Sequence, residues 1–305
     1  MLLSNIYKNV IFHAMFPKEV YIERRSRLRS KIRSGIALFV GNFEMPMNYR
    51  SNTYRFRQDS SFLYFFGLNQ PELVGVMDFD AGTDSIYGND VDIEDIIWMG
   101  PQPSLKEQAA GVGVVTTCPL KDLQGKVNAA IKAGRKIHFL PPYRHQNMMV
   151  LNDLLGVNYG VLSKYVSKEL VKAVVSLRSI KDSYEIAEID HACNVGYQMH
   201  VAAMRMCKPG VYEREIAGFI EGIALQGGGG VSFPVILSQH GETLHNHYHG
   251  NMLEAGKLMI TDAGAEIASG YASDFTRVTP VGGKFTQKQK DIYNIVLAAN
   301  NNTTM

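Results

Sequence analysis

The chain has 305 residues, of which 46% are hydrophobic and 20% are charged, with a formal net charge of +2. These values are near the average of soluble globular proteins, so they exclude wholesale disorder and a fibrous repeat, and the length allows two domains of ordinary size. The small net charge gives no argument for a nucleic-acid or membrane partner. Three scattered cysteines exclude a disulfide scaffold and a cysteine zinc site, and they favour a cytoplasmic location.

The first part of the chain predicts an α/β domain, which we place at residues 1–176. Residues 17–33 predict a helix with a basic, solvated face, since no stacking aromatics interleave with the charges as they would in a nucleic-acid patch. Short apolar runs that end at turn residues predict buried strands, and periodic stretches between them predict helices. The expected strands are 36–40, 73–79, 96–99 and 136–140, and the expected helices are 105–110 and 120–133.

A second domain is expected at residues 177–305. Asp182 and Glu185 have the spacing of a capping box, which predicts a helix from there toward Pro209. A second helix is predicted at 213–225. The glycine run at 227–230 ends it. No Lys-Ser/Thr pair follows, as a phosphate loop would need, and Val-Ser-Phe-Pro at 231–234 instead predicts the start of a strand.

Two aspartates follow this region at a spacing that suggests chemistry. We read the stretch around them as strand, turn and strand, with the reversal near 268–270, so that Asp262 and Asp274 face each other on one side of a hairpin. Facing carboxylates repel unless a proton or a cation neutralises them, and hard oxygens favour a divalent metal. The alternative is that one aspartate caps a turn and the other faces solvent.

Four histidines precede the aspartates, at His240, His245, His247 and His249. The last three alternate, so they would share one face of a strand. Such a row could bind zinc, form a solvated polar strand, or supply one histidine that contacts a substrate.

Several segments resemble the aminopeptidase P family of metallopeptidases, which has the "pita-bread" fold. Phe-Arg-Gln-Asp-Ser-Ser-Phe-Leu-Tyr-Phe-Phe-Gly at 56–67 is similar to the first-domain signature, and Arg-Ser-Ile-Lys-Asp-Ser-Tyr-Glu-Ile at 178–186 is similar to the entry into the catalytic domain. Thr-Leu-His-Asn-His-Tyr at 243–248, Ile-Thr-Asp-Ala-Gly-Ala-Glu at 260–266 and Gly-Tyr-Ala-Ser-Asp-Phe-Thr-Arg-Val-Thr-Pro at 270–280 are similar to its catalytic motifs.

The resemblance implies an α/β N-terminal domain followed by the first half of an α+β pita-bread domain. It implies an exopeptidase that releases the first residue from peptides with proline second, using two divalent ions, typically manganese. By motif, Asp262 and Asp274 occupy metal-ligand positions, and His245 is the catalytic histidine that contacts the substrate, with His247 and His249 as competing assignments. A homodimer formed through the first domain is also implied.

The same comparison predicts what the chain lacks. The family has one more histidine and two glutamates as metal ligands after the hairpin, in motifs that this sequence does not contain. The expectation is therefore a C-terminally truncated form with an incomplete metal site. The alternatives are a non-catalytic remnant or dimerisation module, and a prolidase-type enzyme that cleaves Xaa-Pro dipeptides.

Overall fold

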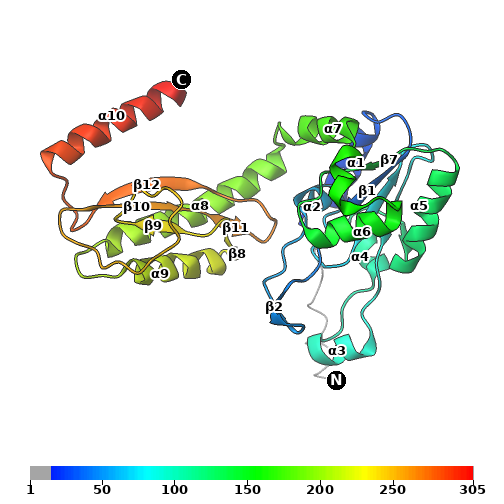
Figure 1. Ribbon diagram of the computed structural model, residues 1–305, viewed down its shortest axis with the longest axis horizontal. Coiled ribbons are helices and arrows are strands. Elements are labelled where there is room, and N and C mark those ends of the chain that lie inside the picture. Colours follow the sequence, from blue (N-terminus) through cyan, green and yellow to red (C-terminus); the bar gives the residue numbers. More distant parts are fainter. Residues whose placement is uncertain (1–14, 305) are drawn as a thin grey trace. The chain divides into compact units, whose positions relative to one another are not determined.

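The structure is a computed structural model that describes residues 15–304 (Figure 1). The chain divides into two compact units between Ile180 and Lys181. The boundary expected after residue 176 lies inside helix α7 (Lys168–Arg178), which belongs to the first unit and packs there against α1 (Lys18–Arg29).

A mixed five-stranded sheet forms the centre of the first unit. Its order is β6 (Thr116–Cys118), β5 (Thr83–Tyr87), β4 (Val74–Asp78), β1 (Ile36–Val40) and β7 (Ile137–Phe139). β1 runs antiparallel to β4 and parallel to β7. The strand predictions at 36–40, 73–79 and 136–140 are therefore confirmed, and most of their apolar side chains are buried as the patterns indicated.

Helices and short segments connect these strands. They are α2 (Ser60–Phe66), α3 (Ile93–Met99), α4 (Leu105–Gly111), α5 (Leu123–Lys132), α6 (His145–Leu155), the 3₁₀ turns η2 (Leu120–Asp122) and η3 (Tyr159–Lys164), and the pair β2 (Pro46–Tyr49) and β3 (Asn52–Thr53). The helices predicted at 105–110 and 120–133 are confirmed. The strand predicted at 96–99 is wrong, because a capping box between Asp92 and Asp95 begins α3 there.

The basic face of α1 is not fully solvated, which corrects the sequence expectation. Arg24 and Arg25 are 3% and 1% exposed. Arg25 donates to the backbone oxygens of Phe65 and Val112 and pairs with Asp84, at 2.7, 2.9 and 2.9 Å. The guanidinium groups therefore satisfy carbonyl groups that the helices of this unit leave buried.

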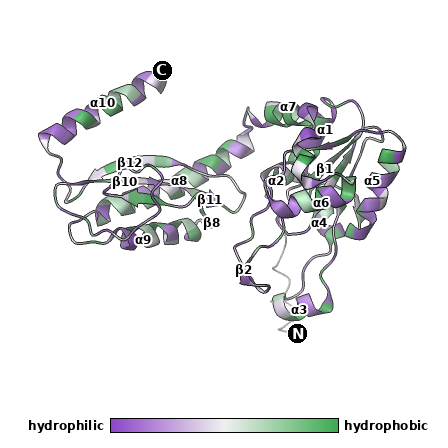
Figure 2. Cartoon of the chain, in the orientation of Figure 1, coloured by the Kyte–Doolittle hydropathy of each residue, from purple (hydrophilic) through white to green (hydrophobic). Residues whose placement is uncertain are grey.

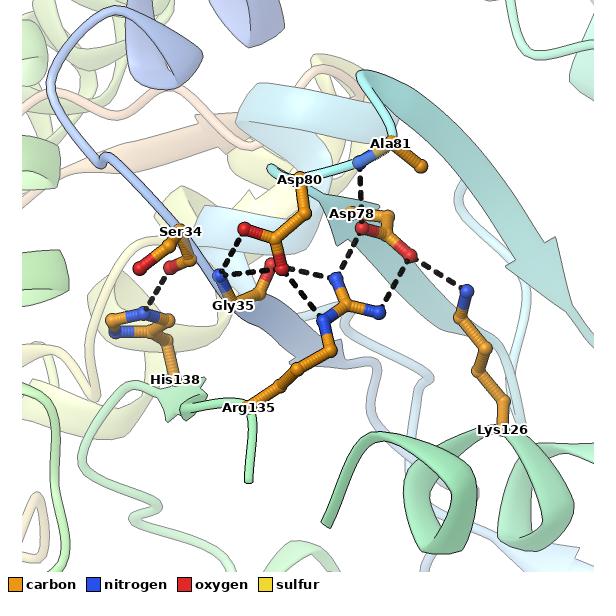
Figure 3. A network of polar contacts seen from close by, with 8 residues as sticks. All are labelled: Ser34, Gly35, Asp78, Asp80, Ala81, Lys126, Arg135 and His138. Carbon is orange, nitrogen blue, oxygen red and sulfur yellow. Dashed lines mark hydrogen bonds and ion pairs between the residues drawn. The ribbon is translucent and has the colours of Figure 1, made fainter. Parts of the chain in front are cut away.

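A second group of charges lies at the end of β4 (Figure 3). Asp78, 3% exposed, accepts hydrogen bonds from Arg135 and from Lys126 Nζ, the latter at 2.7 Å. Arg135 Nε also binds Asp80 at 2.6 Å. Burial by itself would raise the pKa of Asp78, but the bonds from Arg135 and Lys126 outweigh it and hold that pKa well below its usual range.

The second unit contains three helices and five strands in the part that the structure describes. They are α8 (Ser183–Met206), α9 (Glu213–Gln226), β8 (Gly228–Val231), β9 (Ile236–Ser238), β10 (Leu258–Ala263), β11 (Ala265–Ile267), β12 (Phe275–Pro280) and α10 (Gln287–Thr304). The capping box of Asp182 and Glu185 is present, and both predicted helices are confirmed. The glycine run forms β8, which pairs with β11.

The core of this unit lies between helices α8 and α9 and one face of the sheet β12-β10-β9 (Figure 1). Four side chains are fully buried there, namely Met199, Ile216, Leu237 and Met259. Helix α10 has no buried residue, and Figure 2 shows hydrophobic and hydrophilic residues mixed along its length. Among residues 15–304, no helix is both long and apolar enough to cross a membrane.

Candidate metal centre

Strands β10 and β12 form the hairpin that carries both predicted aspartates. Asp262 is paired with Thr276, and Ala263 is paired with Phe275. The turn closes between Ile267 and Tyr271, where the Ile267 N–H donates to the Tyr271 oxygen at 3.0 Å. Three residues therefore form the loop, as expected at 268–270, and Gly270 adopts φ of 79°, which favours glycine.

The two aspartates are diagonal neighbours and do not face each other directly. The loop is centred on residue 269, whereas the prediction placed the centre at 268, so the pairing is displaced by two residues. Continuing this register, Asp274 lies opposite Gly264. A displacement of two keeps both side chains on the same face of the sheet, with diagonal Cβ atoms about 7 Å apart. The prediction of a shared face is confirmed, and the prediction of direct opposition is wrong.

That face is the one turned away from α8 and α9. In β10 the residues directed toward the helices are Met259, Thr261 and Ala263, all buried, and Asp262 alternates with them. Asp274 is exposed. Both carboxylates therefore lie on the open face of the sheet, where Asp274 is exposed and Asp262 is partly buried.

Gly264 allows the two strands to approach at the level of Asp274. A Cβ atom added there would lie 1.8 Å from the Ser273 carbonyl oxygen and 2.7 Å from Ser232 Oγ. Any side chain at this position would push the strands apart, so the spacing of the two aspartates depends on a glycine between them.

The carboxylate of Asp262 is incompletely hydrogen-bonded. Its Oδ1 atom is buried and has no hydrogen-bond partner among the residues that the structure describes. A buried carboxylate oxygen without a partner is costly unless a cation or a donor reaches it. Hard carboxylate oxygens are the ligands that divalent ions such as Mg²⁺ and Mn²⁺ prefer. Within residues 15–304, however, no three His, Cys, Asp or Glu side chains are placed to hold an ion together.

The histidines precede this hairpin in a loop and not in a strand, which corrects the alternating-strand interpretation. His245 lies exposed in a turn. His249 Nδ1 lies 3.0 Å from the Leu237 oxygen, and His247 Nδ1 lies 3.5 Å from the Val235 oxygen. Because a carbonyl oxygen only accepts, Nδ1 of His249 is the donor and its Nε2 is turned elsewhere. His245 makes no such bond in the described part of the chain.

Glu213, in the first turn of α9, holds this loop, although no sequence pattern marks it as a functional residue. Its side chain is 0% exposed. Oε1 accepts from Ser238 Oγ and the Gln239 N–H at 3.0 and 2.8 Å, and Oε2 accepts from Asn251 Nδ2 at 2.9 Å. Gln239 and Asn251 lie at the two ends of the loop that carries the histidines (residues 239–251, the histidine loop), so one carboxylate holds both ends. An acidic residue in a first helical turn is common, so only its burial distinguishes it.

Two family models match the chain in the order of its two units. The first, described as "Aminopeptidase P, N-terminal domain", matches residues 21–138. The second, "Metallopeptidase family M24", matches residues 187–304 and so includes the hairpin with both aspartates. Both units of the chain are therefore similar to parts of the aminopeptidase P family. The fold of the chain is the N-terminal domain of that family followed by a segment of the metallopeptidase domain.

Individual relatives agree with this assignment. The Xaa-Pro aminopeptidase of Escherichia coli is 29% identical over 293 residues, which are 92% of this chain and 66% of that protein. A probable Xaa-Pro aminopeptidase of Chaetomium globosum is 30% identical over 86% of this chain and 43% of its own length. The chain therefore spans less than two thirds of these curated relatives.

Solved structures of the aminopeptidase P family are also similar. Escherichia coli aminopeptidase P with the inhibitor Pro-Leu has a TM-score of 0.79 at 26% identity, covering 93% of this chain and 66% of that one. Proline aminopeptidase P II of Yersinia pestis has a TM-score of 0.80 at 25% identity, covering 94% and 68%. The fold expectation of an α/β domain followed by part of a pita-bread domain is confirmed.

Proposed function

We propose that the chain carries the N-terminal domain and part of the catalytic site of a metal-dependent aminopeptidase that releases the first residue from peptides with proline second. The observation that supports this most directly is the pair Asp262 and Asp274 on the open face of the hairpin, with a buried Asp262 oxygen that lacks a partner. Matched relatives named Xaa-Pro aminopeptidase support the proline preference.

In this proposal Asp262 and Asp274 hold divalent cations, and the expected ion is Mn²⁺. A bound divalent ion lowers the pKa of water and polarises a carbonyl oxygen. The exposed ring of His245 donates a hydrogen bond to the substrate oxygen on which negative charge develops. Glu213 keeps the histidine loop at its place beside β9 through the bonds to Gln239 and Asn251.

The proposal also includes a cellular location and an oligomeric state. Cys118, Cys193 and Cys207 are free, which agrees with a reducing cytoplasm. The aminopeptidase P resemblance suggests a homodimer formed through the N-terminal domain, and light scattering of the purified chain measures this directly.

The deciding experiment measures turnover of the 305-residue chain with added Mn²⁺. The substrates are a tripeptide with proline second, the same tripeptide with alanine second, and an Xaa-Pro dipeptide. Cleavage of the first alone supports the proposal. Preference for the dipeptide supports the prolidase-type alternative, equal cleavage of the alanine peptide contradicts the proline preference, and no cleavage of any supports the non-catalytic alternative for this chain.

Two variants assign the residues. Asp274→Asn is expected to lose Mn²⁺ binding and turnover together. His245→Ala is expected to keep Mn²⁺ binding and to lower the rate by about 10²–10³, the usual effect of removing one oxyanion donor. If His247→Ala behaves in this way and His245→Ala does not, the catalytic assignment moves to His247.

A further inference from the structure

A buried histidine, His200, lies in helix α8 on the opposite side of the sheet from the two aspartates. Its side chain is 5% exposed, and Nε2 lies 3.0 Å from the Ala263 carbonyl oxygen. Because that oxygen only accepts, Nε2 carries the proton. Nδ1 is buried and has no hydrogen-bond partner in the described residues. Burial lowers the pKa of His200, with the bond to Ala263 acting the other way, and the lowered pKa favours the neutral ring.

His200 contacts both members of one cross-strand pair. Ala263, whose oxygen it binds, is paired with Phe275. The Phe275 ring lies 6.0 Å from the imidazole, centroid to centroid, with the planes at 76°, an edge-to-face contact. Ala263 directly follows Asp262, and Phe275 directly follows Asp274. A single side chain thus fixes the residue next to each carboxylate.

The surroundings of His200 bring α8 unusually close to this part of the hairpin. One turn earlier in α8, a Cβ added to Gly196 would lie 2.6 Å from Ser273 Oγ and 3.0 Å from the Phe275 ring. Ser273 Oγ in turn accepts from the Ala265 N–H at 3.1 Å. The helix therefore presses on both strands at the level of the aspartates, and the hairpin has little freedom to shift there.

A purely apolar residue would fill the space that His200 occupies without a directional bond. A hydrogen bond in a low-dielectric interior restricts distance and angle more than apolar packing does. His200 cannot itself be a ligand, because side chains alternate across the sheet and the aspartates project from the other face. Its bond to Ala263 acts on them only through the backbone.

We propose that His200 is a positioning residue that holds Asp262 and Asp274 at the separation at which they share a divalent cation. This rests on the proposed function for the two aspartates as metal ligands. Outer-shell partners that orient metal ligands typically change metal affinity by 10–100-fold when they are removed.

The test compares His200→Gln, His200→Asn and His200→Phe in the 305-residue chain. The glutamine amide reaches the position of Nε2 and keeps a donor for the Ala263 oxygen, whereas the asparagine amide ends near Nδ1 and does not. His138→Phe is the matched control, since His138 is 1% exposed and its Nε2 lies 3.0 Å from the Ser34 carbonyl oxygen in the other unit.

The first readout is the affinity for Mn²⁺ alone, from the electron paramagnetic resonance signal of free Mn²⁺. His200→Asn and His200→Phe are expected to weaken binding at least about 10-fold. His200→Gln and His138→Phe are expected to stay close to the parent. Equal affinity for the glutamine and asparagine variants, both folded by circular dichroism, would overturn the proposal, and this comparison holds even if the phenylalanine variant fails to fold.

The second readout needs no metal and separates the two proposals. Amide hydrogen exchange at Ala263 and Phe275 reports whether this cross-strand pair is held from α8. If the parent chain binds no Mn²⁺, the metal assignment of the proposed function fails. The positioning role is then judged on exchange alone, and unchanged protection of both amides in His200→Asn would overturn it.

Discussion

Two carboxylates with buried oxygens, Asp78 in the first unit and the partly buried Asp262 in the second, have opposite environments. Asp78 in the first unit is bound by Arg135 and Lys126 and by the Ala81 N–H, so every part of the carboxylate has a partner. Asp262 in the second unit has a buried oxygen without a partner in the described residues. Burial alone therefore does not mark a functional acid.

The difference indicates what each acid does. A charge that is neutralised by fixed cations of the same chain stabilises the fold, as in Figure 3. A carboxylate oxygen left without a partner costs folding free energy, and in the proposed function a bound cation would offset that cost. Glu213 is an intermediate case, since its carboxylate is fully buried but is bound by neutral donors of its own unit.

The largest expected effect is at the hairpin spacing. Gly264→Ala places a Cβ atom 1.8 Å from the Ser273 oxygen, so the strands must separate. We expect a loss of at least about 3 kcal/mol in the free energy of unfolding of the second unit, near the upper end for overpacking, and a loss of Mn²⁺ binding. Chemical denaturation and Mn²⁺ titration measure these. The control is Gly218→Ala, where an added Cβ meets nothing within 4 Å; similar behaviour of the two variants would contradict the argument.

Removing a fixed cation tests the structural role of the first carboxylate. Arg135→Ala leaves Asp78 with Lys126 and the Ala81 N–H, and we expect a loss of about 2–3 kcal/mol in the free energy of unfolding, somewhat below the cost of a fully unpaired buried charge. Urea unfolding measures it. Lys136→Ala is the control, because its pair with Glu169 is exposed at 3.4 Å and should contribute under about 1 kcal/mol. Mn²⁺ affinity should not change in either variant. A change would contradict a purely structural role for Asp78.

Glu213→Gln tests the intermediate case. The amide keeps the shape but replaces one acceptor oxygen with a donor, so one of the three bonds to the histidine loop becomes a clash of donors. We expect a loss of about 1–3 kcal/mol and faster amide exchange at Gln239. Glu221→Gln on the exposed side of the same helix is the control. Unchanged exchange at Gln239 would show that Glu213 does not hold the loop.

The smallest effect is on the pH dependence of the two units. The pKa of Asp78 is lowered in the folded state, so its contribution is complete above its ordinary pKa of about 3.9 and is lost only as the pH falls below that value. The pKa of His200 is also lowered, by burial, so its neutral form is favoured and stability is lost as the pH falls below 6.5. Hydrogen exchange with mass spectrometry should therefore show the second unit loosening at a higher pH than the first. The reverse order would contradict both assignments.

Some parts of this molecule followed directly from local sequence. The capping box of α8 is present as expected, and short apolar runs bounded by turn residues became β1, β4 and β7. These features depend on neighbours a few residues apart, so the sequence contains their cause. The strand predicted at 96–99 failed because a short apolar run fits either state and the Asp92 cap decided for helix.

For the aspartate pair, the sequence predicts the shared face of the sheet but not the exact cross-strand pairing. Alternation along a strand determined that Asp262 and Asp274 share a face, because any even displacement preserves it. The exact pairing depended on a turn centred one residue later than expected, which moved Asp274 from opposite Asp262 to opposite Gly264. Only the tertiary structure decided which acids are buried and which of them have hydrogen-bond partners. It also brought His200 against the hairpin and Glu213 against the histidine loop. Local sequence cannot determine these features, because burial arises from contacts between residues far apart in the chain.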